Sequence, residues 1–241
     1  MNVSLYHAAA ALNANSQWQD IISQNLASAS IPGYKRQDVS FSIAAAATGG
    51  GGPAPMQTAT TSTSFTPGPI RPTSGNTDFA IEGDGFFQVE LPGGKTGYTR
   101  DGEFKLDTTG GLVTKDGFKV VGSGGPVQVD LNNPRPMMVG STGEISQGAE
   151  AKGNLAVIQF NDPSKLTPVP GGYFIAADPK LNPTPSAALV RQGYLETSNA
   201  SVVAEMANMI SAMRAFELNQ KVIQMTDDRM QRSIGELSPP A

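Results

Sequence analysis

The chain of 241 residues contains no cysteine and only one histidine, and charged residues make up only 16% of it. Without cysteine there can be no disulfide framework, no thiol nucleophile and no cysteine-ligated metal. The single histidine, His7, cannot supply a histidine metal cluster, and we interpret it as a surface or interface residue. The net charge of −4, with no basic cluster larger than Lys35-Arg36, argues against a nucleic-acid partner.

Long hydrophobic runs are also missing. No stretch reaches the roughly 18 apolar residues that cross a bilayer, so we expect no membrane insertion. The first 18 residues have no basic region and are interrupted by Asn and Gln, so we expect export, if it occurs, without a cleaved signal peptide. Glycine and proline, by contrast, are abundant, with 27 and 18 residues. Such a chain is typical of extracytoplasmic fibre or sheet proteins, although a cytosolic β protein would also fit.

Helical periodicity occurs only near the two ends of the chain. The C-terminal stretch from Ser198 to about Arg232 carries a heptad stripe, and residues 2–30 form a second helix that Pro32 and Gly33 end. We interpret the methionines of this stripe as packing residues rather than as the lining of a peptide-binding groove. Because neither helix has a neighbour in sequence, we expect them to pair. The residues expected at this interface are Leu5, Leu12, Ile22 and Leu26 on one side and Val202, Met206, Met209, Met213, Phe216 and Ile223 on the other.

The sequence between the helices has the pattern of a β domain. Three Asp-Gly pairs, beginning at Asp84, Asp101 and Asp116, separate runs rich in β-forming residues over 69–196. Residues 37–68 are of low complexity and nearly uncharged apart from a short strand over 39–43. We expect a flexible linker there, or a segment that orders against a neighbouring subunit.

The predicted fold class is therefore α+β: paired N- and C-terminal helices, coiled-coil-like, with a central, mostly antiparallel β domain looped out between them. The predicted helical domain is discontinuous and comprises residues 1–36 and 197–235. Ser198 or Asn199 is expected to cap the C-terminal helix. Burial of the apolar stripes alone does not offset the conformational entropy of ordering both ends, so we expect them to be largely disordered in the free monomer and to fold on assembly.

No motif in the chain assembles a chemical site. The three aspartates each precede glycine, where a turn alone favours them, and Gly94-Lys95-Thr96 lacks the earlier glycine and the following helix of a phosphate-binding loop. We therefore predict no catalytic, cofactor-binding or metal-binding residues.

Three blocks resemble the flagellar axial protein family, and within it the rod proteins. They are residues 23–36 (SQNLASASIPGYKR, with Ser28 and Ser30 where the family usually has Asn and Thr), residues 78–121, and residues 193–199 together with 213–223. Blocks of this kind occur in the same order and spacing in the family. The motif residues singled out by the resemblance are Asn25, Leu26, Gly33, Tyr34, Gly83, Gly85, Phe86, Phe87, Ser198, Asn199, Arg214, Phe216 and Glu217.

The resemblance implies a structural subunit of a hollow helical rod in the flagellar basal body. Its partners would be copies of itself, other rod proteins and the flagellar export apparatus, with the helices inside and the β domain outside. Overall length and the block RAFELNQKVI favour the proximal over the distal rod protein. Two other classes are weighed against this one: an oligomeric surface adhesin or carbohydrate-binding β module, and an enzyme.

Overall fold

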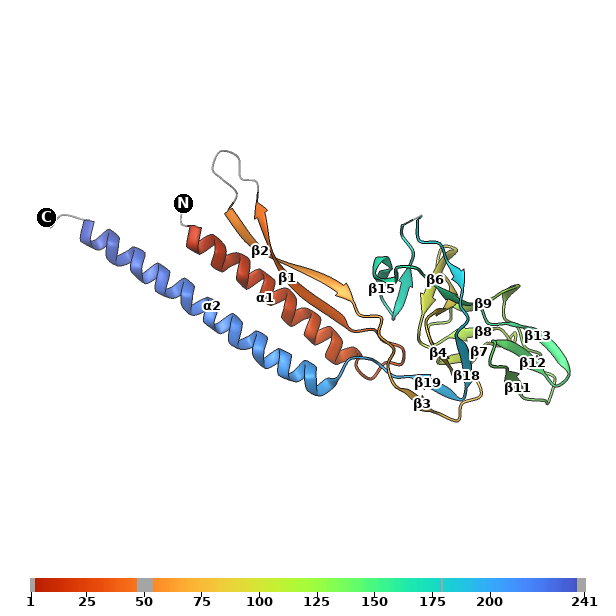
Figure 1. Cartoon of the computed structure of the whole chain (residues 1–241). Helices are drawn as coiled ribbons and strands as arrows, with labels where there is room; N and C mark the ends of the chain where they lie inside the picture. Colours follow the sequence, from red (N-terminus) through yellow and green to blue (C-terminus); the bar gives the residue numbers. More distant parts are fainter. Residues whose placement is uncertain (1–2, 47–53, 179, 238–241) are drawn as a thin grey trace. The chain divides into compact units, whose positions relative to one another are not determined.

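The computed structural model describes residues 3–46, 54–178 and 180–237, and it divides into two compact units. The helical unit contains residues 1–27, 37–63 and 201–241, and the β unit contains residues 28–36 and 64–200. The chain begins with helix α1 (Val3–Ser28) and ends with helix α2 (Val202–Leu237), and strands β1 to β19 lie between them (Figure 1). The predicted α+β class is confirmed, and every strand pairing in the described part of the chain is antiparallel.

Helix α1 buries one face made of small and polar residues. Ala8, Ala14, Asn15, Ile22 and Asn25 are all buried on it. This is the face on which the sequence places Leu12 and Leu26, both half-buried. Small side chains allow neighbouring elements to approach closely, and the buried amides must find hydrogen-bond partners.

An antiparallel hairpin of β1 (Gln37–Ala46) and β2 (Ala54–Thr63) occupies most of the segment expected to be a linker. The predicted strand over 39–43 is confirmed as part of β1, whereas β2 was not predicted. The ten residue pairs of the hairpin run from Gln37 with Thr63 to Ala46 with Ala54. Alternating Ser, Thr and Ala are compatible with a strand, and two contacts with α1 hold it in place. Trp18 packs edge-on against Phe41, and the Asn25 side chain both donates to and accepts from the backbone of Gln37.

Helix α2 buries a stripe whose members recur every three or four residues. Glu205 and Ala212 are fully buried, and Met209, Phe216 and Ile223 are half-buried. Residues of α1, β1 and α2 together line a cavity of about 190 Å³, including Trp18, Asn25, Gln37, Glu205 and Asn208. The two helices and the hairpin therefore meet within the helical unit.

Both helices differ from prediction at their ends. Helix α2 begins at Val202, so neither Ser198 nor Asn199 caps it. Ser198 instead accepts a hydrogen bond from the backbone N–H of Ala200, and the Asn199 side chain donates to the carbonyl of Ser64. The backbone N–H of Glu205 donates to the carbonyl of Ser201 at this helix start. At the other end of the chain, α1 stops at Ser28 rather than residue 30, in a turn that Pro32 and Gly33 continue.

A seven-strand path forms the main sheet of the β unit, in the order β15-β16-β6-β5-β9-β8-β7. Three further strands join this sheet off the path: β10 pairs with β9, and β14 pairs with both β5 and β17. These strands are β5 (Phe86–Leu91), β6 (Lys95–Thr99), β7 (Phe104–Leu106), β8 (Leu112–Thr114), β9 (Lys119–Gly122), β10 (Gly125–Pro126), β14 (Val157–Gln159), β15 (Thr167–Val169), β16 (Tyr173–Ile175) and β17 (Thr184–Pro185).

Smaller sheets complete the β unit. One is the three-stranded sheet β11-β12-β13, and β18 pairs with β4 and β19 with β3. Their bounds are β3 (Ile70–Pro72), β4 (Phe79–Glu82), β11 (Met137–Val139), β12 (Glu144–Gln147), β13 (Glu150–Asn154), β18 (Leu189–Gln192) and β19 (Tyr194–Glu196), and a 3₁₀ turn spans Pro163–Lys165.

Strand β5 separates two hydrophobic clusters, because successive side chains of a strand point to opposite faces. Phe87 and Val89 enter the larger cluster with Phe79 and Phe104, whereas Phe86 enters a second cluster with Tyr98, Phe160 and Phe174. The pair Phe86-Phe87 of the family motif thus supplies both cores. Leu155 and Val157 are also in the larger cluster.

The Asn25 contacts give a test of the hairpin. Asn25→Ala leaves the backbone N–H and C=O of Gln37 without these partners, so we expect the helical unit to lose about 1–3 kcal/mol. Urea unfolding at a protein concentration at which the helical unit is folded, followed by the fluorescence of Trp18, the one tryptophan of the chain, would measure the loss. Asn13→Ala, at an exposed position of α1, is the matched control, and equal midpoints for the two variants would contradict the assigned role.

Candidate functional site

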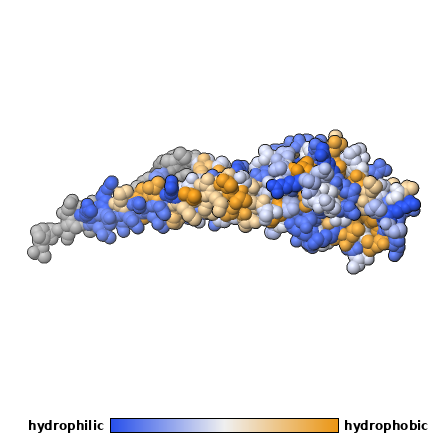
Figure 2. Space-filling view, turned by 90° about the horizontal axis from the view of Figure 1, so that it is seen from below, coloured by the Kyte–Doolittle hydropathy of each residue, from blue (hydrophilic) through white to orange (hydrophobic). Residues whose placement is uncertain are grey.

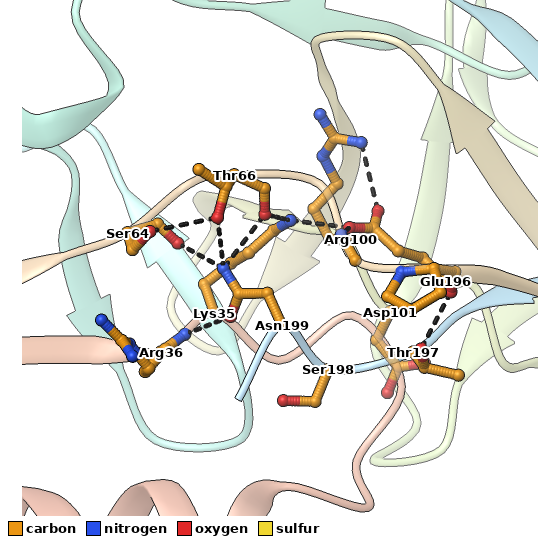
Figure 3. Close-up of polar contacts among 12 residues, drawn as sticks. Lys35, Arg36, Ser64, Thr66, Arg100, Asp101, Glu196, Thr197, Ser198 and Asn199 are labelled. Atoms are coloured by element: carbon orange, nitrogen blue, oxygen red, sulfur yellow. Dashed lines mark hydrogen bonds and ion pairs between the residues drawn. The ribbon is translucent and has the colours of Figure 1, made fainter. Parts of the chain in front are cut away.

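Three charged side chains meet in the interior of the β unit. The Glu196 carboxylate accepts a hydrogen bond from Lys35 Nζ at 2.6 Å and another from Arg100 Nη1 at 3.2 Å (Figure 3). All three side chains are at most 3% exposed. We call these residues the buried charge cluster.

Backbone groups satisfy much of the remaining hydrogen-bonding capacity of the buried charge cluster. Glu196 Oε1 also accepts from the N–H of Gly68 at 2.8 Å, and Lys35 Nζ donates to the carbonyl of Thr66 at 2.9 Å. Arg100 Nη2 donates to the carbonyl of Gly83 at 2.8 Å, and its guanidinium lies 5.3 Å from the centre of the Phe86 ring. Lys35 and Glu196 therefore both hold the segment 66–68, and Arg100 holds the loop at Gly83.

Burial sets the electrostatics of the two cations. Desolvation lowers the pKa of Lys35 and of Arg100, and the nearby Glu196 carboxylate opposes both shifts. A buried ion pair of this kind adds little net stability over apolar packing, but loss of one partner leaves an uncompensated charge. The cluster therefore acts mainly to specify how these segments come together.

Gly33 brings the chain close enough for this arrangement. Its φ is +67°, in the left-handed region that glycine adopts readily, and its N–H donates to the carbonyl of Glu196 at 2.8 Å. A Cβ at this position would lie 2.3 Å from the backbone of Arg100 and Asp101. Only glycine fits where these backbones meet.

The Asn199 side chain binds backbone groups next to the buried charge cluster. Its side-chain oxygen accepts from the N–H of Arg36 at 2.7 Å, and its amide donates to the carbonyls of Ser64 and Thr66 (Figure 3). Its own N–H donates to the carbonyl of Tyr34 at 3.4 Å. The motif residue expected to cap α2 instead ties together the segments that lead into and out of the hairpin.

The predicted motif residues thus have different positions. Gly33, Tyr34 and Asn199 lie around the buried charge cluster, Gly83 and Phe86 contact Arg100, and Asn25 holds β1. Gly85 lies against Val157 and Ser186, and Phe87 is in the core. Leu26 is half-buried, and Arg214 and Glu217 are exposed on α2.

Sequence reasoning missed the three charged residues themselves. Each lies inside a quoted block: Lys35 after Gly33-Tyr34, Arg100 before Asp101-Gly102, and Glu196 before Thr197-Ser198-Asn199. Charge within the blocks did not single them out, because Arg36 lies beside Lys35 and residues 78–121 contain many other charged residues. Spacing in the sequence gave no means of pairing them, because Lys35 and Glu196 are 161 positions apart.

The predicted interface residues divide between two sides of α2. Met209, Phe216 and Ile223 are half-buried within the helical unit, whereas Val202, Met206 and Met213 are exposed. A straight helix drifts by about 20° per heptad relative to a 3.5-residue repeat, so a heptad stripe turns gradually around its surface. On the N-terminal side Ile22 is buried, and the side chain of Leu5 lies outside the described residues.

The aspartates that the sequence assigns to turns have structural contacts. Asp101 forms an ion pair with Lys115 at 2.9 Å, and Asp116 accepts from the Tyr173 hydroxyl at 2.7 Å. Gly94-Lys95-Thr96 lies where β5 turns into β6. In the described part of the chain no three acidic, histidine or cysteine side chains group as metal ligands, and no helix is long and apolar enough to cross a membrane.

Three family models match successive parts of the chain. They are the flagella basal body rod protein model over residues 5–35, the flagellar hook protein FlgE/F/G D1 domain over 80–147, and the flagellar basal body rod FlgEFG protein C-terminal model over 191–236. Lys35, Arg100 and Glu196 come from these three regions, one from each. The fold and these matches define a structural component of the bacterial flagellum rather than an enzyme.

Full-length relatives narrow the assignment. The chain is 33% identical to a protein of Buchnera aphidicola named flagellar basal-body rod protein FlgG, over 95% of this chain and 97% of the relative. It is 33% identical to FlgF of Caulobacter vibrioides, over 90% and 91%, and 31% identical to FlgF of Mesorhizobium japonicum, over 98% of both. The chain belongs to the flagellar basal-body rod protein family, whose place is the flagellar basal body.

The buried charge cluster predicts that a single substitution of Glu196 strongly lowers the stability of the β unit. Glu196→Gln keeps the shape of the side chain but leaves two buried cations without a counter-charge, so we expect a loss of about 3–5 kcal/mol from the β unit. Urea unfolding followed by the near-ultraviolet circular dichroism of Tyr98 and Tyr173, both buried in this unit, would measure it.

Glu82→Gln is the matched control. Glu82 pairs with Arg191 at 2.6 Å in the same unit, but both side chains are nearly half exposed, so its loss should cost about 0–1 kcal/mol. Equal losses for the two glutamates would show that burial does not set the strength of the cluster.

Proposed function

We propose that the chain is a subunit of the flagellar rod that polymerises through its helical unit into a hollow helical shaft. The observation that carries this proposal is the apolar surface that α2 leaves uncovered in the single chain. Eight large apolar side chains of α2 between Val202 and Met225 are 44–79% exposed. In Figure 2, seen from below, apolar side chains follow the helical unit over much of its length.

An uncovered surface of this kind favours contact with further subunits. Monomeric proteins rarely leave contiguous apolar patches exposed unless a partner covers them. The names of the relatives place those proteins in the basal-body rod. Other rod proteins and further copies of this chain are therefore the proposed partners. A shaft built this way would transmit torque and form part of the export conduit, with the flagellar export apparatus as an additional partner.

Within the family we propose the proximal rod protein, FlgF, with the distal rod protein, FlgG, as the alternative. The alignment with the FlgF of Mesorhizobium japonicum supports this, because it extends over 242 positions and covers 98% of both chains. The length of the chain and the block RAFELNQKVI point the same way.

We further propose that α1 and α2 pair in the coiled-coil-like manner expected from the sequence. Support comes from the half-buried Leu12 and Leu26 on α1 and from Met209, Phe216 and Ile223 on α2, all within one unit. Buried Asn15 and Glu205 would fix the register, as isolated polar groups in helical interfaces do.

A double variant tests the role of this face. Met209→Asp with Phe216→Asp places two charges on the half-buried stripe of α2, so it should abolish incorporation into rods while leaving the β unit folded. Motility and the content of purified hook-basal bodies would report incorporation. Two exposed polar positions of α2, Gln220→Asp and Gln224→Asp, make the control. Normal motility of the double variant would count against the proposal.

Folding of the ends on assembly is tested by hydrogen exchange. In a dilute monomer we expect amides of α2 between Val202 and Ile223 to exchange much faster than those of β5, because a helix that buries only one stripe has few tertiary contacts. Mass spectrometry of exchanged peptides would compare the two segments. Equal protection would show that the helices are already stable before assembly.

A further inference from the structure

Helix α2 carries two separate exposed apolar patches. The first α2 patch consists of Val202, Val203, Met206, Ile210 and Met213, which are 47–79% exposed. The second α2 patch consists of Leu218, Val222 and Met225, which are 44–62% exposed.

The two patches face different directions. Residues of an α-helix follow one another by about 100°, so the centres of the patches lie about 110–120° apart around the axis. Each is also about 110–130° from the stripe through Glu205, Ala212 and Ile223 that is buried in the helical unit. The helix thus has three faces, one buried within the chain and two uncovered.

Each apolar patch covers only part of the length of α2. On the side of the first α2 patch the following exposed residues are Glu217, Lys221, Gln224 and Asp228, all polar. On the side of the second α2 patch the preceding exposed residues are small or charged: Ala204, Ala207, Ser211 and Arg214. One straight helix lying along α2 therefore cannot cover both patches.

We propose that the first α2 patch of one copy packs against the second α2 patch of another copy. This rests on the proposed function, in which copies of the chain assemble, and it specifies the contact between them. A contact between two different patches is heterologous, and unless it closes into a ring it extends without limit, as a rod requires. A two-fold contact of either patch with itself would leave the other uncovered.

The positions of the two α2 patches also set how far neighbouring copies are displaced along the helix. Their centres are separated by about 14 residues, so parallel copies joined in this way are displaced by about 20 Å along the helix. Methionine in both patches provides adaptable packing. Each patch is much smaller than the roughly 20–30 residues per partner of a stable interface, so one contact is weak and repeated contacts are needed.

Disulfide trapping tests the pairing, and the absence of cysteine makes the chain suited to it. Met206→Cys and Val222→Cys are made as separate full-length chains, checked for folding by circular dichroism, mixed at high concentration and oxidised. We expect the mixture to form dimers several-fold faster than either variant alone, with mass spectrometry identifying a peptide that links positions 206 and 222.

Gln224→Cys replaces Val222→Cys in the control mixture. Gln224 is exposed at nearly the same height on α2 but about 160° around the axis, so its mixture should not exceed the single variants. Dimers that form equally fast from Met206→Cys alone, or from the control mixture, would overturn the pairing.

A charge exchange provides a second test that needs no disulfide. Met206→Glu and Val222→Lys should each weaken self-association several-fold, and the chain with both changes should recover because opposite charges then meet across the contact. Sedimentation of the unmodified chain, measured in parallel, separates the two proposals. No self-association of that chain at any concentration would overturn the proposed function, whereas association without recovery in the double variant would overturn only the patch pairing.

Discussion

The β unit depends on the contact of one carboxylate with two cations. Glu196 binds Lys35 and Arg100 in the interior, away from water. Glu196 and Lys35 hold the segment 66–68, and Arg100 holds the loop at Gly83. Such a contact contributes more to specificity than to net stability. It requires that the segment after α1, the start of the β body and the segment before α2 all be in place together. This explains why residues 28–36 belong to the β unit and not to the helix that precedes them.

The sequence predicted the elements with strong periodicity and missed those defined by long-range pairing. The α+β class, both helices and the antiparallel β body followed from spacing and from the Asp-Gly turns. Of the hairpin, the sequence predicted only the short strand over 39–43. The rest was expected to be a linker, because its Ser, Thr and Ala residues carry no apolar alternation; contacts from Trp18 and Asn25 stabilise the hairpin. The partners of Lys35 were not predictable, since charge alone does not select a partner 161 residues away.

The helical unit combines two kinds of surface on one helix. Its most deeply buried residues on α2, Ala212 and Glu205, are small or polar, and they specify a position more than they supply hydrophobic free energy. The larger apolar side chains, such as Val203 and Leu218, lie outside. A soluble monomer rarely exposes so many large apolar side chains together on one helix. It is the distribution expected when further hydrophobic burial takes place between subunits.

The separation of Lys35 from Glu196 also has a consequence during synthesis. A nascent chain that has not yet reached residue 196 contains both cations but lacks the carboxylate, the β19 strand and the backbone acceptor of Gly33. Contacts between distant residues delay folding, because loop closure must precede them. The ribosome would therefore have to complete most of the polypeptide before the β unit could close, and until then the chain would remain open to chaperones.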